Sequence, residues 1–193
     1  MLIQKFKDIP IVLGSQSPRR KELLQKMGFD FQVIVKETDE HFDAQQSPHE
    51  IVEHIAIHKM LGFDSDTFYD TLVITADTVV VYKDEILGKP REKKEAFQML
   101  RKLQGDRHEV FTAVALQYQG CVKSFVETTA VEFYPLSEEE IDYYIKNYNP
   151  FDKAGSYGIQ EWLGYTGIKT ITGSYDNVVG LPTARLYQEM KKL

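Results

Sequence analysis

The chain of 193 residues is long enough for one sizeable domain or for two lobes that share a cleft. Its formal net charge of -6 argues against a protein that coats nucleic acid or an anionic membrane, because such proteins need a broad basic surface. The single cysteine, Cys121, excludes an internal disulfide and a cysteine-based zinc site, and it fits a reducing compartment.

The N-terminal segment MLIQKFKDIPIVLG has an apolar run that is too short and too interrupted for a signal peptide. No other segment approaches the stretch of about 20 apolar residues that a membrane span requires. We therefore expect a cytoplasmic protein with no membrane partner and no nucleic-acid partner.

The first predicted strand, Ile11 to Leu13, leads into the stretch SQSPRR and a helix predicted from Pro18 to Met27. Ser17 is the expected N-cap, which places Arg19 and Arg20 in the first turn, where the helix dipole disfavours a cation. Either the arginines bend back to an acidic neighbour, or an anion is held by backbone N–H groups, serine hydroxyls and both guanidiniums. Phosphate or polyphosphate fits the second interpretation best.

An acidic loop that contains Glu40 follows the second predicted strand, Phe31 to Val35. Several carboxylates on one loop are most often solvated charge. A polyphosphate substrate, however, requires a divalent cation, and magnesium takes one or two carboxylates together with waters and phosphate oxygens. Glu40 and Asp77 are therefore the candidate metal ligands.

The helix predicted from Pro48 to Leu61 carries an apolar stripe, and Lys59 falls within that stripe. The lysine either covers the edge of the core while its ammonium reaches water, or it aims the ammonium into a cleft. His54 and His58, four residues apart, could in principle hold a metal. Because no third metal-ligating residue follows at a spacing typical of metal sites, a solvated helix face is the better interpretation.

The next two predicted strands, Leu72 to Thr75 and Val79 to Tyr82, are separated by the residues ADT. Asp77 is thus expected where a strand ends, which is the usual place for ligands in α/β sheets. A structural role as a turn cap is common, but the apolar run that follows penalises an unneeded charge. Lys89, in the stretch LGKP, adds an ammonium to this carboxylate.

The second half of the chain contains a predicted hairpin and three predicted helices. The hairpin strands, Glu109 to Tyr118 and Val122 to Phe133, flank Gln119-Gly120. The helices run from Lys93 to Leu103, from Glu138 to Asn147 and from Pro182 to Lys192. Before the last helix, FDKAGSYGIQ ends with Gln160, and its glycines suit either a close approach to a ligand or an ordinary turn. These elements predict an α/β fold with a mixed twisted sheet flanked by helices, in one domain over residues 1–193.

Six stretches, in this order, resemble the Maf family of nucleoside triphosphate pyrophosphatases: LGSQSPRRKELL, ITADTVV, LGKP, HEVFTAVAL, DKAGSYGIQ and GSYDNVVGLP. The resemblance implies an elongated, two-lobed fold with a central cleft, and often a homodimer. It also implies hydrolysis of a nucleoside triphosphate to the monophosphate and pyrophosphate, with Mg²⁺ or Mn²⁺ as the divalent cation.

Residue by residue, the resemblance identifies a phosphate-binding loop at Ser15, Arg19 and Arg20. The other polar cleft residues of the family correspond here to Glu40, Lys59, Asp77 and Lys89, with Asp77 at the position of the proton acceptor. These residue types suit the chemistry, because attack of water on the α-phosphorus needs a base, a metal and cations that neutralise the pyrophosphate.

Arg20, Thr78 and Gln160 match the subgroup of the family that acts on dTTP and UTP. A glutamine amide can accept from N3–H and donate to O4 of uracil or thymine, whereas a subgroup that acts on 7-methyl-GTP carries glutamate. Glu161 departs from the family pattern, which usually has glycine after GIQ, so Glu161 could face the base instead. The choice between ordinary and modified pyrimidine nucleotides stays open.

Two other functions stay open from the sequence. A non-catalytic nucleotide sensor or regulator of septum formation, a role with which the family has also been linked, would bind nucleotide without turnover. A kinase or phosphatase built on the same basic cluster would release other products. The complete set of Asp77, Glu40, Lys59 and Lys89 favours a house-cleaning pyrophosphatase.

Overall fold

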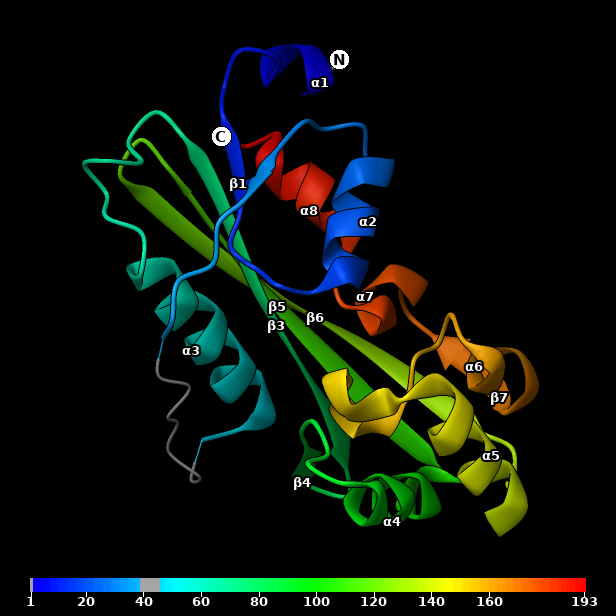
Figure 1. Cartoon of the computed structure of the whole chain (residues 1–193). Helices are drawn as coiled ribbons and strands as arrows, with labels where there is room; N and C mark the ends of the chain where they lie inside the picture. Colours follow the sequence, from blue (N-terminus) through cyan, green and yellow to red (C-terminus); the bar gives the residue numbers. More distant parts are fainter. Residues whose placement is uncertain (1, 39–45) are drawn as a thin grey trace. The chain divides into compact units, whose positions relative to one another are not determined.

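A computed structural model describes residues 2–38 and 46–193 of the chain (Figure 1). The described residues form a seven-stranded mixed sheet that is flanked by helices, with strand order β2-β1-β3-β5-β6-β7 and with β4 paired to β3. Three long strands, β3 (Leu72–Tyr82), β5 (Arg107–Tyr118) and β6 (Cys121–Phe133), form the middle of this order. The predicted α/β class with a mixed sheet is therefore confirmed.

The described part of the chain divides into two compact units. The first comprises Met1–Asp77, Thr112–Glu127 and Gly180–Leu193, and the second comprises Thr78–Phe111 and Thr128–Val179. Each of the three long strands contributes residues to both units.

In the first unit, the short strand β1 (Ile11–Leu13) is wholly buried and lies between two parallel neighbours. It pairs with β2 (Gln32–Val33) on one side and with the start of β3 on the other, and the last β3 residue in this register is Ile74, opposite Leu13. The helices of this unit are α1 (Leu2–Lys5), α2 (Pro18–Lys26), α3 (Pro48–Leu61) and α8 (Thr183–Met190).

In the second unit, β4 (Glu85–Leu87) pairs antiparallel with β3, and β7 (Ile168–Thr172) pairs antiparallel with β6. The helices are α4 (Lys93–Leu103), α5 (Glu138–Tyr148), α6 (Trp162–Thr166) and α7 (Tyr175–Val179), with 3-10 turns at Pro150–Asp152 and Ala154–Ser156. A buried apolar cluster, which includes Leu100, Phe133 and Ile141, forms the core of this unit.

The predicted strands on either side of Asp77 are in fact one continuous strand, β3, so the prediction that Asp77 ends a strand was wrong. The residues ADT stay extended and carry the strand from its parallel partner β1 to its antiparallel partner β4. Asp77 nevertheless lies three residues beyond Ile74, where the parallel pairing with β1 stops. It therefore still follows the carboxyl end of the parallel ladder, the place where α/β sheets present ligand-binding residues.

Candidate active site

The loop SQSPRR folds in the first unit as the sequence predicts, with Ser17 as the N-cap of α2. The Ser17 hydroxyl accepts a hydrogen bond from the backbone N–H of Arg20 at 3.4 Å. Ser15 is buried, and its hydroxyl accepts from the Ser17 backbone N–H at 3.3 Å and from Arg20 Nη1 at 3.1 Å. The two serines thus fix the loop that leads into the helix.

The guanidinium of Arg20 is bound to backbone carbonyl groups from two distant parts of the first unit. Its Nε donates to the carbonyl oxygen of Gly180 at 2.8 Å, and its Nη1 donates to that of Ala76 at 2.9 Å. These carbonyl oxygens offset the unfavourable position of a cation at the start of a helix. The bond to Ala76 also attaches α2 to the strand residue that immediately precedes Asp77. Arg19, half-buried, lies in the same helical turn.

Lys59 and Asp77 form a close ion pair in the first unit. The distance from Lys59 Nζ to Asp77 Oδ1 is 2.7 Å, and the two side chains are only 19% and 17% exposed. Helix α3 buries the apolar stripe that surrounds Lys59, and the Thr75 hydroxyl donates to the carbonyl oxygen of Ala56 at 2.7 Å, which attaches α3 to β3. The Lys59 ammonium thus pairs with a carboxylate, and the interpretation that it is aimed into a cleft stays a prediction.

Three other predicted site residues belong to the second unit. Thr78 follows Asp77 directly and is half-buried. Lys89 is exposed, and the residue before it, Gly88, accepts a hydrogen bond from the backbone N–H of Gly155 at 3.0 Å. This bond joins the stretch LGKP to the stretch FDKAGSYGIQ, at whose end Gln160 lies. Two motifs far apart in the sequence are thereby brought side by side.

Gln160 lies in a tight turn of the second unit. The backbone N–H of Glu161 donates to the carbonyl oxygen of Gly158 at 3.0 Å, so Ile159 and Gln160 are the two central residues of the turn. Ile159 is buried, whereas Gln160 is half-buried. Its side-chain Oε1 is buried and has no hydrogen-bond partner among the residues that the structure describes. A buried amide oxygen without a partner is costly, and a ligand that donates a hydrogen bond would satisfy it.

The carboxylate of Glu161 is bound within the second unit. Glu161 Oε1 lies 3.1 Å from Nζ of Lys153, whose side chain is 8% exposed, and the hydroxyl of Tyr144 donates to Glu161 Oε2. Burial, and secondarily this bond to a carboxylate, raises the pKa of the Tyr144 hydroxyl. The alternative that Glu161 faces the base therefore loses support. The sequence pattern identified neither Tyr144 nor Lys153 as a partner of Glu161, because both contacts depend on packing.

The predicted metal ligand Glu40 lies outside the described residues, together with the rest of the loop 39–45. Within the described ranges, no group of three or more His, Cys, Asp or Glu side chains is placed to hold a metal ion. His54 and His58 stack their rings on α3 with centroids 5.8 Å apart. The metal thus stays a prediction, with Asp77 as its described candidate ligand.

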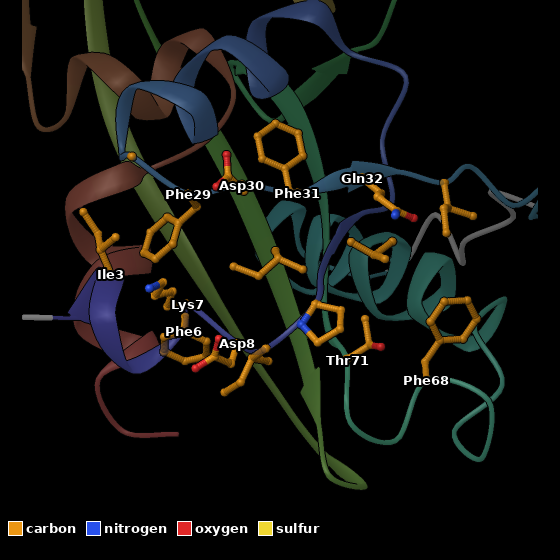
Figure 2. Close-up of a pocket in the computed structure, with 16 residues that line it drawn as sticks. Ile3, Phe6, Lys7, Asp8, Phe29, Asp30, Phe31, Gln32, Phe68 and Thr71 are labelled. Atoms are coloured by element: carbon orange, nitrogen blue, oxygen red, sulfur yellow. The ribbon is translucent and has the colours of Figure 1, made fainter.

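The first unit contains a hollow of about 550 Å³ (Figure 2). Figure 2 shows Lys7 and Asp8, which precede β1, and Phe68 and Thr71, which precede β3, along its wall. Because β1 and β3 are parallel, these residues lie at the amino ends of the strands, opposite to the ends that lead to Ser15 and Asp77. None of the predicted site residues that the structure describes lines the hollow.

These features define an α/β protein whose polar residues gather after the carboxyl end of a parallel ladder, beside an arginine-rich helix start. The chain belongs to the Maf family, because the family model of the Maf-like protein matches residues 10–193. A relative from Phocaeicola vulgatus, named dTTP/UTP pyrophosphatase, is 46% identical over 193 residues and covers 100% of both chains. A relative with the same name from Flavobacterium psychrophilum is 46% identical over 187 residues, which are 97% of this chain and 96% of the relative.

Similarity to solved structures is weaker. A nucleoside-triphosphatase, or dITP/XTP pyrophosphatase, from Mycobacterium abscessus matches with a TM-score of 0.44 and 12% identity, covering 95% of this chain and 97% of the other. The Ham1 protein of Staphylococcus aureus matches with a TM-score of 0.44 and 18% identity, covering 64% of this chain and 71% of the other.

No helix in the described part of the chain is long and apolar enough to cross a membrane.

Proposed function

We propose that this protein is a nucleoside triphosphate pyrophosphatase that hydrolyses dTTP and UTP to the nucleoside monophosphate and pyrophosphate. The observation that carries the proposal is the partly buried Lys59–Asp77 pair directly after the parallel ladder, beside the helix-start loop of Ser15 and Arg20. Relatives with the name dTTP/UTP pyrophosphatase, close to half identical over nearly the whole chain, support the choice of substrate.

In the proposed reaction, Asp77 accepts a proton from the water that attacks the α-phosphorus. The Lys59 ammonium, 2.7 Å from Asp77 Oδ1, orients the carboxylate, as a general base requires. Serine and arginine side chains of the loop SQSPRR bind the triphosphate, with Arg19 and Arg20 as the cations. Lys89, exposed at the end of LGKP, contributes a further cation that stabilises the negative charge of the leaving pyrophosphate.

The base is read by Gln160; a contribution of Thr78 and Arg20 to substrate choice is implied by the match of these positions to the dTTP/UTP subgroup. The orphaned Oε1 of Gln160 accepts from N3–H of uracil or thymine, and the amide nitrogen donates to O4. A guanine base presents two donors to the same edge and would leave the amide nitrogen opposite a donor. We therefore expect a preference for UTP and dTTP over GTP of about 1 to 3 kcal/mol.

A divalent cation, Mg²⁺ or Mn²⁺, is part of the proposal. Its preferred donors are carboxylate oxygens, and Asp77 supplies such a group close to the phosphate loop, which fits the ion. Asp77 and Glu40 would hold it, and when bound it would neutralise phosphate charge and polarise the phosphate oxygens. A cytoplasmic location and a homodimer belong to the same proposal, on the strength of the sequence alone.

A nucleotide panel tests the function. The protein is incubated with dTTP, UTP, CTP, GTP and 7-methyl-GTP in the presence of Mg²⁺ or Mn²⁺, and both pyrophosphate and orthophosphate are measured. We expect pyrophosphate from dTTP and UTP above all. Orthophosphate alone would indicate a phosphatase, and binding without either product would indicate a nucleotide sensor. Turnover of 7-methyl-GTP above that of UTP would contradict the substrate assignment.

The role of Asp77 is tested by Asp77→Asn. This isosteric change removes the base and the charge that pairs with Lys59, so turnover should fall by about two to four orders of magnitude while UTP still binds. Asp70→Asn, at an exposed position of the same unit, is the matched control and should keep full activity. Wild-type turnover of Asp77→Asn would remove Asp77 from the reaction.

The role of Gln160 is tested by Gln160→Glu. The carboxylate can no longer donate to O4, so kcat/KM should fall for UTP and dTTP, and relative use of guanine nucleotides should rise. Gln98→Glu, on the exposed face of α4, makes the same chemical change elsewhere in the unit and should leave the ranking of substrates unaltered. An unchanged ranking in Gln160→Glu would mean that Gln160 does not contact the base.

A further inference from the structure

A glutamine amide alone does not distinguish uracil from cytosine. Uracil presents the donor N3–H beside the acceptor O4, whereas cytosine presents the acceptor N3 beside the donor N4 amino group. Rotation of the amide by half a turn exchanges its oxygen and nitrogen, so a freely rotating Gln160 could pair with either base. Discrimination between the two therefore requires something that holds the amide in one orientation.

We propose that Tyr144, Lys153 and Glu161 form this device, as positioning residues that fix the Gln160 turn and set its selectivity for uracil-type over cytosine bases. The inference rests on the proposed role of Gln160 in reading the base. None of the three residues needs to touch the nucleotide.

The hydroxyl of Tyr144 binds both end residues of the turn in which Gln160 is one of the two central residues. It accepts a hydrogen bond from the backbone N–H of Gly158 at 2.9 Å and donates one to the carboxylate of Glu161. Glu161 in turn closes the turn through its own backbone N–H. Tyr144 is fully buried on α5, so this anchor is a fixed point of the core. The backbone on either side of Gln160 is thereby held in place.

The carboxylate of Glu161 lies against the same face of the turn as the amide of Gln160. A Cβ atom added to Gly158 would stand 2.8 Å from Glu161 Cδ, 2.9 Å from its Oε2 and 3.2 Å from Gln160 Nε2. The space that the glycine leaves is thus shared by the carboxylate and the amide nitrogen. A negative charge beside the amide favours the orientation that turns the NH₂ group, and not the oxygen, toward it.

Lys153 keeps the Glu161 carboxylate in this position. Its ammonium lies 3.1 Å from Glu161 Oε1 and 2.8 Å from Oδ1 of Asp152, and its side chain is 92% buried, since only 8% is exposed. Lys153 contacts Oε1, whereas Oε2 lies beside the turn, so Glu161 stays charged and orients the glutamine amide while its charge is paired and is not offered to guanine donors. This accounts for a glutamate immediately next to the base-reading residue.

The test compares affinities for UMP and CMP by titration calorimetry, for the wild type and for Tyr144→Phe and Glu161→Gln. Tyr144→Phe removes only the hydroxyl that joins the two ends of the turn. Glu161→Gln keeps an acceptor for Tyr144 but removes the charge that orients the amide. The matched control is Tyr148→Phe, on the same helix, with a ring that stacks on that of Tyr144 at 5.2 Å. The ratio of the two affinities does not depend on the folded fraction of a preparation.

We expect the wild type to prefer UMP, the ratio to fall about tenfold in both variants, and the control to keep it. Equal affinities in the wild type, or a wild-type ratio in both variants, would overturn the inference. Because no turnover is needed, a protein that binds UMP selectively and releases no pyrophosphate would refute the proposed reaction while still testing the positioning residues.

Discussion

Replacement of Arg20 by methionine should destabilise the first unit by about 2 to 4 kcal/mol. The guanidinium makes hydrogen bonds of 2.8 and 2.9 Å to two backbone carbonyl oxygens and one of 3.1 Å to the Ser15 hydroxyl. A hydrogen bond from a charged donor contributes about 1.5 to 3 kcal/mol, but bonds that share one donor group are not additive. The methionine stem keeps the packing, so the loss measures the hydrogen bonds.

Arg20→Lys should recover about half of this loss. Lysine keeps the positive charge, but its compact ammonium cannot reproduce the planar fork that reaches the carbonyl oxygens of Gly180 and Ala76 in different directions. The graded series from arginine through lysine to methionine therefore separates the effect of charge from that of geometry.

Urea unfolding at equilibrium measures the free energy of unfolding of the three proteins, and each 1 kcal/mol corresponds to about 2 to 4 °C in melting temperature for a chain of this size. Arg101→Met is the control, because Arg101 is 66% exposed and lies 3.6 Å from Glu138. A surface ion pair of this kind contributes about 0 to 1 kcal/mol. Wild-type stability of Arg20→Met would refute the structural role of the guanidinium and would leave phosphate binding as its main role.

Two further predictions concern the second unit. Burial lowers the pKa of His108 from 6.5 to about 4. As the pH falls from 6.5 to 4, the unfolded chain therefore binds a proton at this residue before the folded protein does. Up to about 3 kcal/mol of the folding stability that is present above pH 6.5 is lost over this range. His108→Phe should flatten this part of the pH dependence in urea unfolding, and an unchanged slope would contradict a neutral buried His108. Gly155→Ala should lower the free energy of unfolding by about 2 kcal/mol, because the φ angle is +66° and the new Cβ would lie 2.9 Å from Val80. Gly88→Ala is the control and should change the free energy of unfolding little, because no atom lies within 4 Å of its added Cβ. Equal effects of the two substitutions would refute the packing argument.

The predictable part of the site is the part that depends on local sequence. The N-cap at Ser17, the first-turn position of Arg20 and the location of Lys59 in an apolar stripe all follow from helix periodicity and capping rules. Their partners could not be predicted in the same way. Arg20 binds carbonyl groups 56 and 160 residues away, and Tyr144 binds a carboxylate 17 residues away, so only the folded chain brings these atoms together.

The fold shows the same division. Long amphipathic helices and the hairpin around Gln119-Gly120 were predictable, and both turn residues have the positive φ angles that such a turn requires. The hairpin between β3 and β4 was missed, because its turn residues, Lys83 and Asp84, also have positive φ angles but include no glycine. Strand β7 was missed because four of its five residues are exposed, so it has no alternating pattern.

In each unit, one residue expected to act on the substrate, Asp77 or Gln160, is held in place by neighbouring side chains. Lys59 orients the carboxylate of Asp77, and Arg20 fixes the carbonyl group just before it, while Tyr144 and Glu161 hold the turn of Gln160. Positioning of this kind lowers the barrier because the reacting groups lose little further freedom on reaching the transition state. Arg20 makes three hydrogen bonds within its own unit, one of them to the carbonyl group just before Asp77, in addition to its proposed role in binding the triphosphate, so its loss should lower kcat as well as raise KM.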